Sequence, residues 1–291
     1  MISCLMGNAV FMHTVKDYAD YYIGSESNQA TEAWDLSSYM QEIGKGYDSL
    51  RAGNAILSSY KALIEKAKLS SDINIIDLSK IEALSNAFDN MSKAMEENYN
   101  KSKTDKAKTV NNFFLSAYNA LNYENGQVDI YTFADRIGRT NDYYTDDYTA
   151  VKNELQAAVK NAVISNVTSE GMYQDGKGIS FETMSYYIDS NPDAMDNISF
   201  APEYISFVKQ ISYDIISYRY SSALDITASY NNGLKYTVKT PVAIGSAQLD
   251  IGAFDADTPE NNRVGTLADI IIPEQQYDEA SGLFTYKFNF G

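Results

Sequence analysis

The sequence predicts an α/β protein that ends in a small β-rich module. Across residues 1–222, apolar residues recur at the spacing of amphipathic helices, and short β-branched runs separate these stretches. All five prolines lie at or beyond Pro192, so the strongest helix breaker does not interrupt the first part of the chain. From about Leu224 the pattern changes to short strands with turn signals. We therefore expect two domains, at residues 1–222 and 223–291.

Individual elements of the first domain follow from the period of the apolar residues. Helices are expected at residues 9–18, 34–43, 50–69, 132–139, 146–163 and 202–218, and strands at 21–23, 73–76 and 128–131. Asp77 can cap a further helix. The apolar stripe of that helix is formed by Leu78, Ile81, Leu84, Phe88, Met91 and Met95. Such a stripe is typical of a core. The lysine-rich stretch 101–108 is interpreted as a solvated helix start or a linker.

The β-rich module is predicted from turn chemistry. Asn231-Asn232-Gly233 is typical of a hairpin turn, here between strands at 225–230 and 234–240. Further strands are expected at 242–254, 266–272 and 283–290.

The amino-acid composition limits the classes of molecule that the protein is expected to bind. The 291 residues carry a formal net charge of −16, with a pI near 4.4. This acidic field argues against nucleic acid, because phosphate groups bind lysine and arginine, and against anionic membrane surfaces. The same field attracts peptides that bear lysine or arginine, although a generic acidic surface is the simpler interpretation. No apolar run reaches the length of about 18 residues that a membrane-spanning helix needs.

The chain contains one cysteine, Cys4, and one histidine, His13. One cysteine cannot form an intramolecular disulfide or a zinc–thiolate cage, and one histidine excludes a multi-histidine metal site. A lone cysteine is commonly a small buried apolar side chain, but a nucleophilic cysteine needs thiolate character and access. Cys4 lies just before a predicted helix, whose N-terminus would favour a thiolate. In a continuous helix His13 would lie on the opposite face from Cys4, so we expect a structural role for it.

Several segments resemble those of clostripain-like cysteine peptidases, and they occur in the order found in that family. Cys4-Leu5-Met6-Gly7-Asn8 resembles the nucleophile motif. The other similar segments are Asp17 to Glu26, Trp34, Ile73 to Ile81, Val128 to Ala134, Gly178 to Ser180 and Phe200 to Phe207. Together they extend over roughly residues 1 to 220, so the chain resembles the C-terminal portion of the family's peptidase domain, beginning at the nucleophile motif.

This resemblance implies part of a caspase-like α/β/α sandwich, in which the nucleophilic cysteine follows one strand and the histidine follows the preceding strand. It implies a cysteine endopeptidase that cleaves peptides or proteins after Arg or Lys, with Cys4 as the nucleophile. Acidic residues line the specificity pocket of the family, so Glu32 and Asp35 are candidate substrate-binding residues. Family members are usually exported, which implies an extracellular or cell-surface location, although the first twelve residues do not form a secretory signal.

The chain also departs from the family pattern. Ile2 occupies the position of the motif's aspartate, and Ala30 and Ala33 replace the usual Pro and Gly before Trp34. The strand that carries the family's histidine does not occur in these 291 residues. We therefore expect a truncated chain without peptidase activity of its own, whose histidine comes from an N-terminal half. The alternatives are a non-catalytic descendant that binds a peptide or partner, and an unrelated extracellular structural module.

No cofactor is expected for this chemistry, but some family members need calcium, so the resemblance extends to a possible calcium requirement. The segment Asp255 to Glu260 offers alternating oxygen ligands. It lacks the central Gly and the closing Glu of an EF-hand loop, and an ordinary polar hairpin loop is the simpler interpretation.

Overall fold

The computed structural model describes most of the chain. The described residues are 4–29, 36–123, 126–137, 148–169, 175–182, 195–219, 225–230, 234–240, 247–252, 263–271, 274–278 and 283–290. The chain divides into two compact units, one made of Met1–Glu97 and Leu115–Asp214 and one made of Asn98–Phe114 and Ile215–Gly291. The domain boundary at residue 222 stays a prediction.

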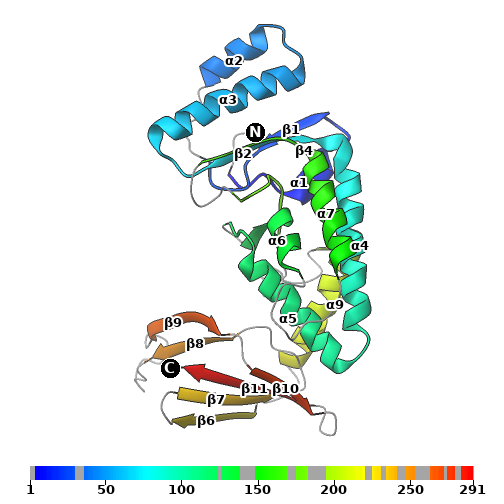
Figure 1. Ribbon diagram of the computed structural model, residues 1–291, viewed down its shortest axis with the longest axis vertical. Helices are drawn as coiled ribbons and strands as arrows, with labels where there is room; N and C mark the ends of the chain where they lie inside the picture. The colour runs from blue at the N-terminus through cyan, green and yellow to red at the C-terminus, as the bar shows by residue number, and fades with distance from the viewer. Residues whose placement is uncertain are drawn as a thin grey trace. The chain divides into compact units, whose positions relative to one another are not determined.

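A three-stranded antiparallel sheet runs through the first unit (Figure 1). Its strands are β1 (Tyr21–Gly24), β2 (Asp72–Asp77) and β4 (Val163–Thr168), in the order β1-β2-β4. Because β2 pairs with a neighbour on each side, it is buried from Asp72 to Ile76. The β-branched run at 73–76 predicted this buried strand.

One face of this sheet is covered by α3 (Ser49–Ala67), and α2 (Leu36–Gly44) packs on α3 (Figure 1). Asp48 caps α3, since its side chain accepts a hydrogen bond from the Arg51 N–H at 2.8 Å. The shared core cluster consists of Leu57, Tyr60 and Ile64 from the helix and Ile73 and Ile75 from β2. Successive strand residues point to opposite faces, so Asp72 and Asn74 lie on the face away from α3.

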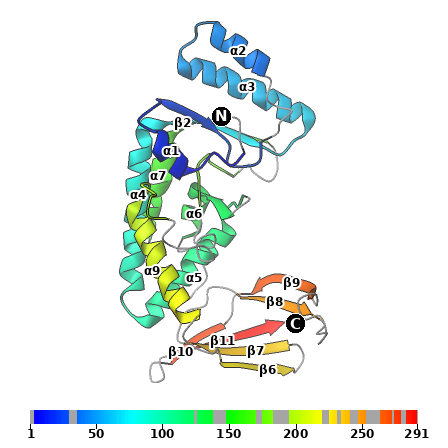
Figure 2. The same ribbon diagram turned by 180° about the vertical axis from the view of Figure 1, so that it is seen from behind.

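Figure 2 shows α1 (Ala9–Val15), α4 (Ile81–Tyr99) and α7 (Thr149–Ala162) on the side of the sheet away from α3. Asp77 caps the short 3-10 helix η2 (Leu78–Lys80) that leads into α4, and its carboxylate accepts from the Ser79 N–H at 2.9 Å. Every residue of the predicted apolar stripe is buried. Phe88 is the centre of an aromatic cluster on α4. Its ring lies 4.8–6.4 Å, between centroids, from those of Phe133, Phe181, Phe200 and Tyr204.

Between α4 and β6 (Asp225–Tyr230), the described part of the chain contains two short strands and three helices besides α7 and β4. They are α5 (Lys103–Asn119), β3 (Gln127–Asp129), α6 (Ile130–Arg136), β5 (Ser180–Glu182) and α9 (Pro202–Arg219). β3 and β5 form an antiparallel pair. Asp129 caps α6 by accepting from the Thr132 N–H at 2.6 Å. None of the helices in the described part of the chain is both long enough and apolar enough to cross a membrane.

The C-terminal strands are all antiparallel. They are β6 (Asp225–Tyr230), β7 (Leu234–Thr240), β8 (Ala247–Gly252), β9 (Arg263–Ile271), β10 (Glu274–Asp278) and β11 (Leu283–Phe290). One sheet has the order β10-β11-β7-β6, and β8 pairs with β9. The predicted strands at 225–230, 234–240 and 283–290 are confirmed, whereas β10 was not predicted. The predicted turn at 231–233 lies outside the described residues.

Replacing Phe88 by Ala should lower the free energy of unfolding by about 3–5 kcal/mol, because a large buried ring leaves a cavity that its neighbours cannot fill. Urea denaturation followed by far-UV circular dichroism measures this change. The control is Met40→Ala on α2, where the side chain is 66% exposed and the expected change is within about 0.5 kcal/mol. Equal effects of the two substitutions would contradict the assignment of Phe88 to the core.

Candidate active site

Cys4 lies at an exposed position, and its segment is paired with a turn that follows β1. The Leu5 N–H donates to the Ser27 carbonyl at 3.2 Å, and the Gly7 N–H donates to the Ser25 carbonyl at 2.7 Å. The same turn continues to Gln29, whose backbone N–H donates to the Cys4 sulfur at 3.2 Å. The thiol of the candidate nucleophile is therefore both accessible and in contact with a backbone donor.

The backbone directly after Cys4 is unusual. Leu5 has a φ of 60°, in the left-handed region that residues with a side chain seldom adopt. The helix α1 begins only at Ala9, and the Asn8 side chain caps it by accepting from the Val10 N–H at 2.8 Å. Because a helix dipole acts within about one turn, the expected help of this helix to a Cys4 thiolate is small. The Gln29 N–H, in contrast, lies within hydrogen-bond distance of the sulfur.

Gly7 is required by a close approach of two backbones. A Cβ at this position would lie 2.7 Å from the Glu26 nitrogen and 2.8 Å from the Ser25 carbonyl carbon. The Gly7 carbonyl in turn accepts from the Ser180 N–H at 2.7 Å. The nucleophile segment is thus held between the Ser25–Ser27 turn and β5, and a side chain at Gly7 would push it away from the turn.

A buried carboxylate, Asp72 at the start of β2, organises that turn. It accepts from the Ser25 hydroxyl at 2.9 Å, the Glu26 N–H at 2.9 Å and the Ser27 N–H at 2.8 Å. It also accepts from the Ser27 hydroxyl and, at 2.6 Å, from the Asn74 side-chain amide. Asp72 is 1% exposed, and a buried carboxylate is stable when its oxygens are fully hydrogen-bonded.

A second buried acid, Glu26, lies next to this network. Its Oε2 accepts from the Tyr123 hydroxyl at 3.0 Å and from the Gly178 N–H at 2.8 Å. Within the described part of the chain, Oε1 has no hydrogen-bond partner. Burial, reinforced by the charges of Asp129 and Asp72, raises the pKa of Glu26 well above its ordinary value. Burial also raises the pKa of Asp129. Glu26 therefore favours its neutral form inside the fold.

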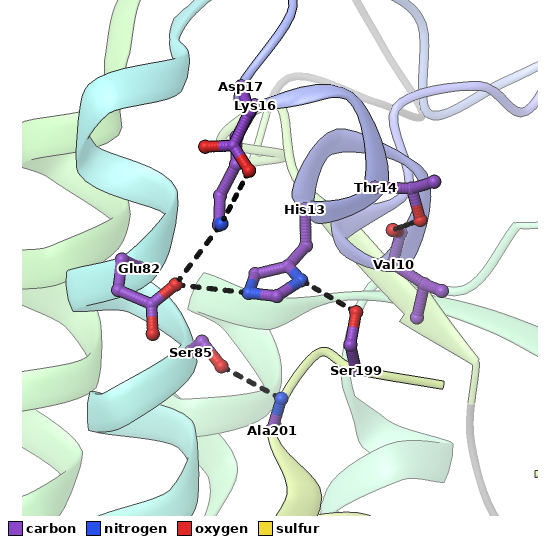
Figure 3. Close-up of polar contacts among 9 residues, drawn as sticks. All are labelled: Val10, His13, Thr14, Lys16, Asp17, Glu82, Ser85, Ser199 and Ala201. Atoms are coloured by element: carbon purple, nitrogen blue, oxygen red, sulfur yellow. Dashed lines mark hydrogen bonds and ion pairs between the residues drawn. The ribbon is translucent and has the colours of Figure 1, made fainter. Parts of the chain in front are cut away.

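His13 is engaged elsewhere. It belongs to α1, and Figure 3 shows its ring between Glu82 of α4 and Ser199, which precedes α9. Nδ1 lies 3.0 Å from the Ser199 Oγ, and Nε2 lies 3.1 Å from the Glu82 Oε2. Lys16 also approaches the Glu82 carboxylate, at 3.7 Å. Both ring nitrogens have partners other than Cys4, and the histidine ties three parts of the first unit together.

A neighbouring contact in Figure 3 also joins α4 to the start of α9. The Ala201 N–H donates to the Ser85 hydroxyl of α4 at 2.8 Å. One turn along α4, Asp89 accepts from the N–H groups of Glu203 and Tyr204, at 2.9 and 3.2 Å. These bonds satisfy donors at the start of α9 that have no partner within the helix.

The other predicted site residues cannot be placed. Glu32 and Asp35 lie outside the described residues, as do Ile2, Ala30 and Ala33 and the candidate calcium segment Asp255 to Glu260. Among the residues that the structure describes, no group of His, Cys, Asp or Glu side chains is arranged to hold a metal ion. Sequence reasoning missed Gln29, because it contributes a backbone group, and Asp72, because it lies just before the predicted apolar strand at 73–76.

In this α/β fold the exposed Cys4 thiol lies beside a backbone N–H donor. A family model described as the clostripain family matches residues 1–227, which is more than half of the chain. The protein therefore belongs to the clostripain family. This membership contradicts the hypothesis of an unrelated extracellular module. No curated protein matches the chain in a sequence search.

Three solved structures are similar to this chain. A secreted cysteine protease from Bacteroides thetaiotaomicron, solved with an irreversible peptide inhibitor, is 15% identical with a TM-score of 0.51, and the match covers 69% of this chain and 56% of that one. A clostripain from the same organism, in complex with a peptide inhibitor, is 14% identical with a TM-score of 0.48, covering 70% and 85%. An inactive zymogen from Parabacteroides distasonis is 12% identical, with a TM-score of 0.46 and coverage of 72% and 56%.

The first of these likenesses supports the predicted caspase-like fold. The chain spans about half of the length of that secreted protease, at 56%.

Gly7→Ala should destabilise the protein by about 1–3 kcal/mol, because the added methyl group meets backbone atoms that cannot move aside cheaply. Gly44→Ala at the end of α2 is the matched control, since a Cβ there meets nothing within 4 Å. That substitution should be neutral or stabilise by up to about 1 kcal/mol. Thermal unfolding of the two variants checks this, and a Gly7→Ala variant as stable as the wild type would contradict the close approach.

Glu26→Gln should make the protein progressively more stable than the wild type as the pH rises. In the unfolded chain Glu26 loses its proton near its ordinary pKa of about 4.3, whereas the folded protein retains the proton because the pKa is raised. The wild type therefore loses stability from that pH up to the raised pKa. Urea denaturation at about pH 5 and about pH 8 measures the difference.

Glu65→Gln is the control, because Glu65 is a solvent-exposed residue of α3 whose side chain is 61% accessible. It should show no comparable gain between the two pH values. A Glu26→Gln variant that follows the wild type at both pH values would show that Glu26 ionises normally in the folded state.

Proposed function

We propose that this chain provides the nucleophile of a cysteine endopeptidase that cleaves peptides after Arg or Lys. Membership of the clostripain family supports the peptidase chemistry. The single observation that carries the site assignment is the Cys4 sulfur, which is exposed and accepts a hydrogen bond from the Gln29 N–H. A donor to the sulfur stabilises the thiolate, which is the reactive form of cysteine.

The proposed reaction proceeds in two steps. The Cys4 thiolate attacks the scissile carbonyl carbon and forms a thioester, while the C–N bond breaks and a general acid gives a proton to the leaving amine. Water then attacks the thioester, the same group accepts one proton of that water, and the carboxylic acid leaves as the C–S bond breaks and the Cys4 thiolate is restored.

We propose that the acid–base group comes from a polypeptide outside these 291 residues. The chain has one histidine, and both of its ring nitrogens lie within hydrogen-bond distance of Ser199 and Glu82. Figure 3 shows the His13 ring directed at Glu82 of α4 on one side and at Ser199 on the other. The 291-residue chain by itself is therefore proposed to be inactive, and an N-terminal half that carries the family's histidine would complete it.

Specificity for basic residues is the second part of the proposal. Glu32 and Asp35 follow the turn that Asp72 holds, so they stand in sequence shortly after the donor Gln29. Carboxylates at this point would attract the positive side chain of a substrate, and the net charge of −16 would assist its approach.

We also propose an extracellular location. The similar protease from Bacteroides thetaiotaomicron is described as secreted. A dependence on calcium is a separate proposal, which rests on the family resemblance.

A non-catalytic binding protein is the second candidate. Ile2 in place of the motif's aspartate and the engagement of His13 favour it. Such a protein would keep the fold and bind a peptide or partner without cleaving it. The rate at which Cys4 is alkylated separates the two candidates, because a retained active site reacts far faster than free cysteine does at the same pH.

The purified chain should not hydrolyse fluorogenic peptides that end in Arg or Lys. Mixed with an N-terminal region of a clostripain-family protease that carries the histidine, it should cleave them and spare matched peptides that end in Glu. The reason is that the thiol then gains its general base. Release of the fluorophore measures the turnover.

Two variants make this test specific. Cys4→Ala should abolish turnover by the complex, whereas His13→Gln should retain it, because His13 is proposed to have no part in the chemistry. Turnover by the 291-residue chain on its own that is lost in Cys4→Ala would refute the need for a second polypeptide. A complex that forms but never cleaves would favour the binding protein.

A further inference from the structure

The peptide group between Asn28 and Gln29 is held from both of its polar ends. Its N–H, from Gln29, donates to the Cys4 sulfur at 3.2 Å. Its carbonyl, from Asn28, accepts from the Ser71 hydroxyl at 3.1 Å. In a trans peptide the N–H and C=O point in opposite directions. The Ser71 hydroxyl and the Cys4 sulfur therefore lie on opposite sides of one rigid planar group.

Ser71, the residue just before β2, is itself held by several hydrogen bonds. Its N–H donates to the Ser169 hydroxyl at 3.0 Å, and its carbonyl accepts from the Ser169 N–H at 2.9 Å. Its hydroxyl lies 2.7 Å from the hydroxyl of Tyr60 on α3. Ser71 is fully buried, with 0% exposure. A buried hydroxyl with fixed partners has one orientation, so it can impose one on the peptide that it touches.

We propose that Ser71 is a positioning residue for the Cys4 nucleophile. By donating to the Asn28 carbonyl, it fixes the plane of the following peptide so that the Gln29 N–H points at the Cys4 sulfur. It also polarises that peptide, because a hydrogen bond to a carbonyl strengthens the N–H of the same group as a donor. The result is a backbone donor that is held in place toward the Cys4 sulfur.

This inference deepens the proposed function, since it concerns the same thiol. It gives the Cys4 sulfur a fixed hydrogen-bond donor in a chain where His13 is engaged elsewhere and α1 begins at Ala9. Asp72, the residue after Ser71, holds the Ser25–Ser27 turn. Two adjacent residues, Ser71 just before β2 and Asp72 at its start, thus set the position of the turn and the orientation of its last donor.

The test is the pH profile of Cys4 alkylation by iodoacetamide in the 291-residue chain. The single cysteine makes the reacting site unambiguous. In Ser71→Ala the rate at about pH 7 should fall about three- to tenfold, and the midpoint of the profile should move to higher pH, because the charged sulfur loses part of its hydrogen bond. Ser71→Thr retains the hydroxyl and should restore most of the rate.

Two controls distinguish orientation from loss of stability. Tyr60→Phe removes the other partner of the Ser71 hydroxyl and should keep the wild-type profile, although thermal unfolding should show a destabilised protein. Ser165→Ala removes an exposed hydroxyl on β4 that bonds Asn54, and it should change neither property. A Ser71→Ala profile that superimposes on the wild type would overturn the inference, as would an equal shift in Tyr60→Phe.

The readout does not depend on peptide cleavage. A shifted profile in Ser71→Ala supports the positioning role even if no reconstituted complex hydrolyses a peptide, in which case the proposed function fails and this inference stands. Cleavage by the complex together with an unshifted profile would uphold the proposed function and overturn the role of Ser71.

Discussion

The hydrogen bonding of the Asp72 carboxylate is the interaction on which the candidate site depends. A carboxylate buried without partners would cost several kcal/mol, but here it accepts from Ser25, Glu26, Ser27 and Asn74. Because it takes two backbone N–H groups of one turn, it fixes the course of that turn. The nucleophile segment pairs with the same turn through Leu5 and Gly7, so the place of Cys4 follows from a residue distant in sequence.

In β2, successive side chains point to opposite faces of the sheet, and this lets one strand serve both the core and the turn. Ile73 and Ile75 pack on α3 and belong to the core cluster, while Asp72 and Asn74 face the other side of the sheet and meet the polar turn. A central strand with one apolar and one polar face is therefore both the support of the fold and the anchor of the site. Burial raises the pKa of Glu26, which favours its neutral form next to Asp72 and Asp129.

Most elements of the first unit were predictable because their apolar periods are strong. The stripe from Leu78 to Met95 and the β-branched run at 73–76 both specified their elements. The strands β4 and β10 were missed for physical reasons. β4 follows α7 without a turn residue, and its burial is intermediate at alternate positions. β10 reads Glu-Gln-Gln-Tyr-Asp, whose polar residues give no apolar period, so its pairing with β11 specifies it.

The sequence by itself determined the family of the protein, its candidate nucleophile and its acidic character, because these depend on which residues occur and in what order. The tertiary structure decided what surrounds the nucleophile. It placed His13 against Glu82 and Ser199 and brought the Gln29 N–H to the Cys4 sulfur. The direction of a backbone N–H does not depend on the identity of its own side chain. It is set by the hydrogen bonds of Ser71 and Asp72, which only the folded chain brings to that turn.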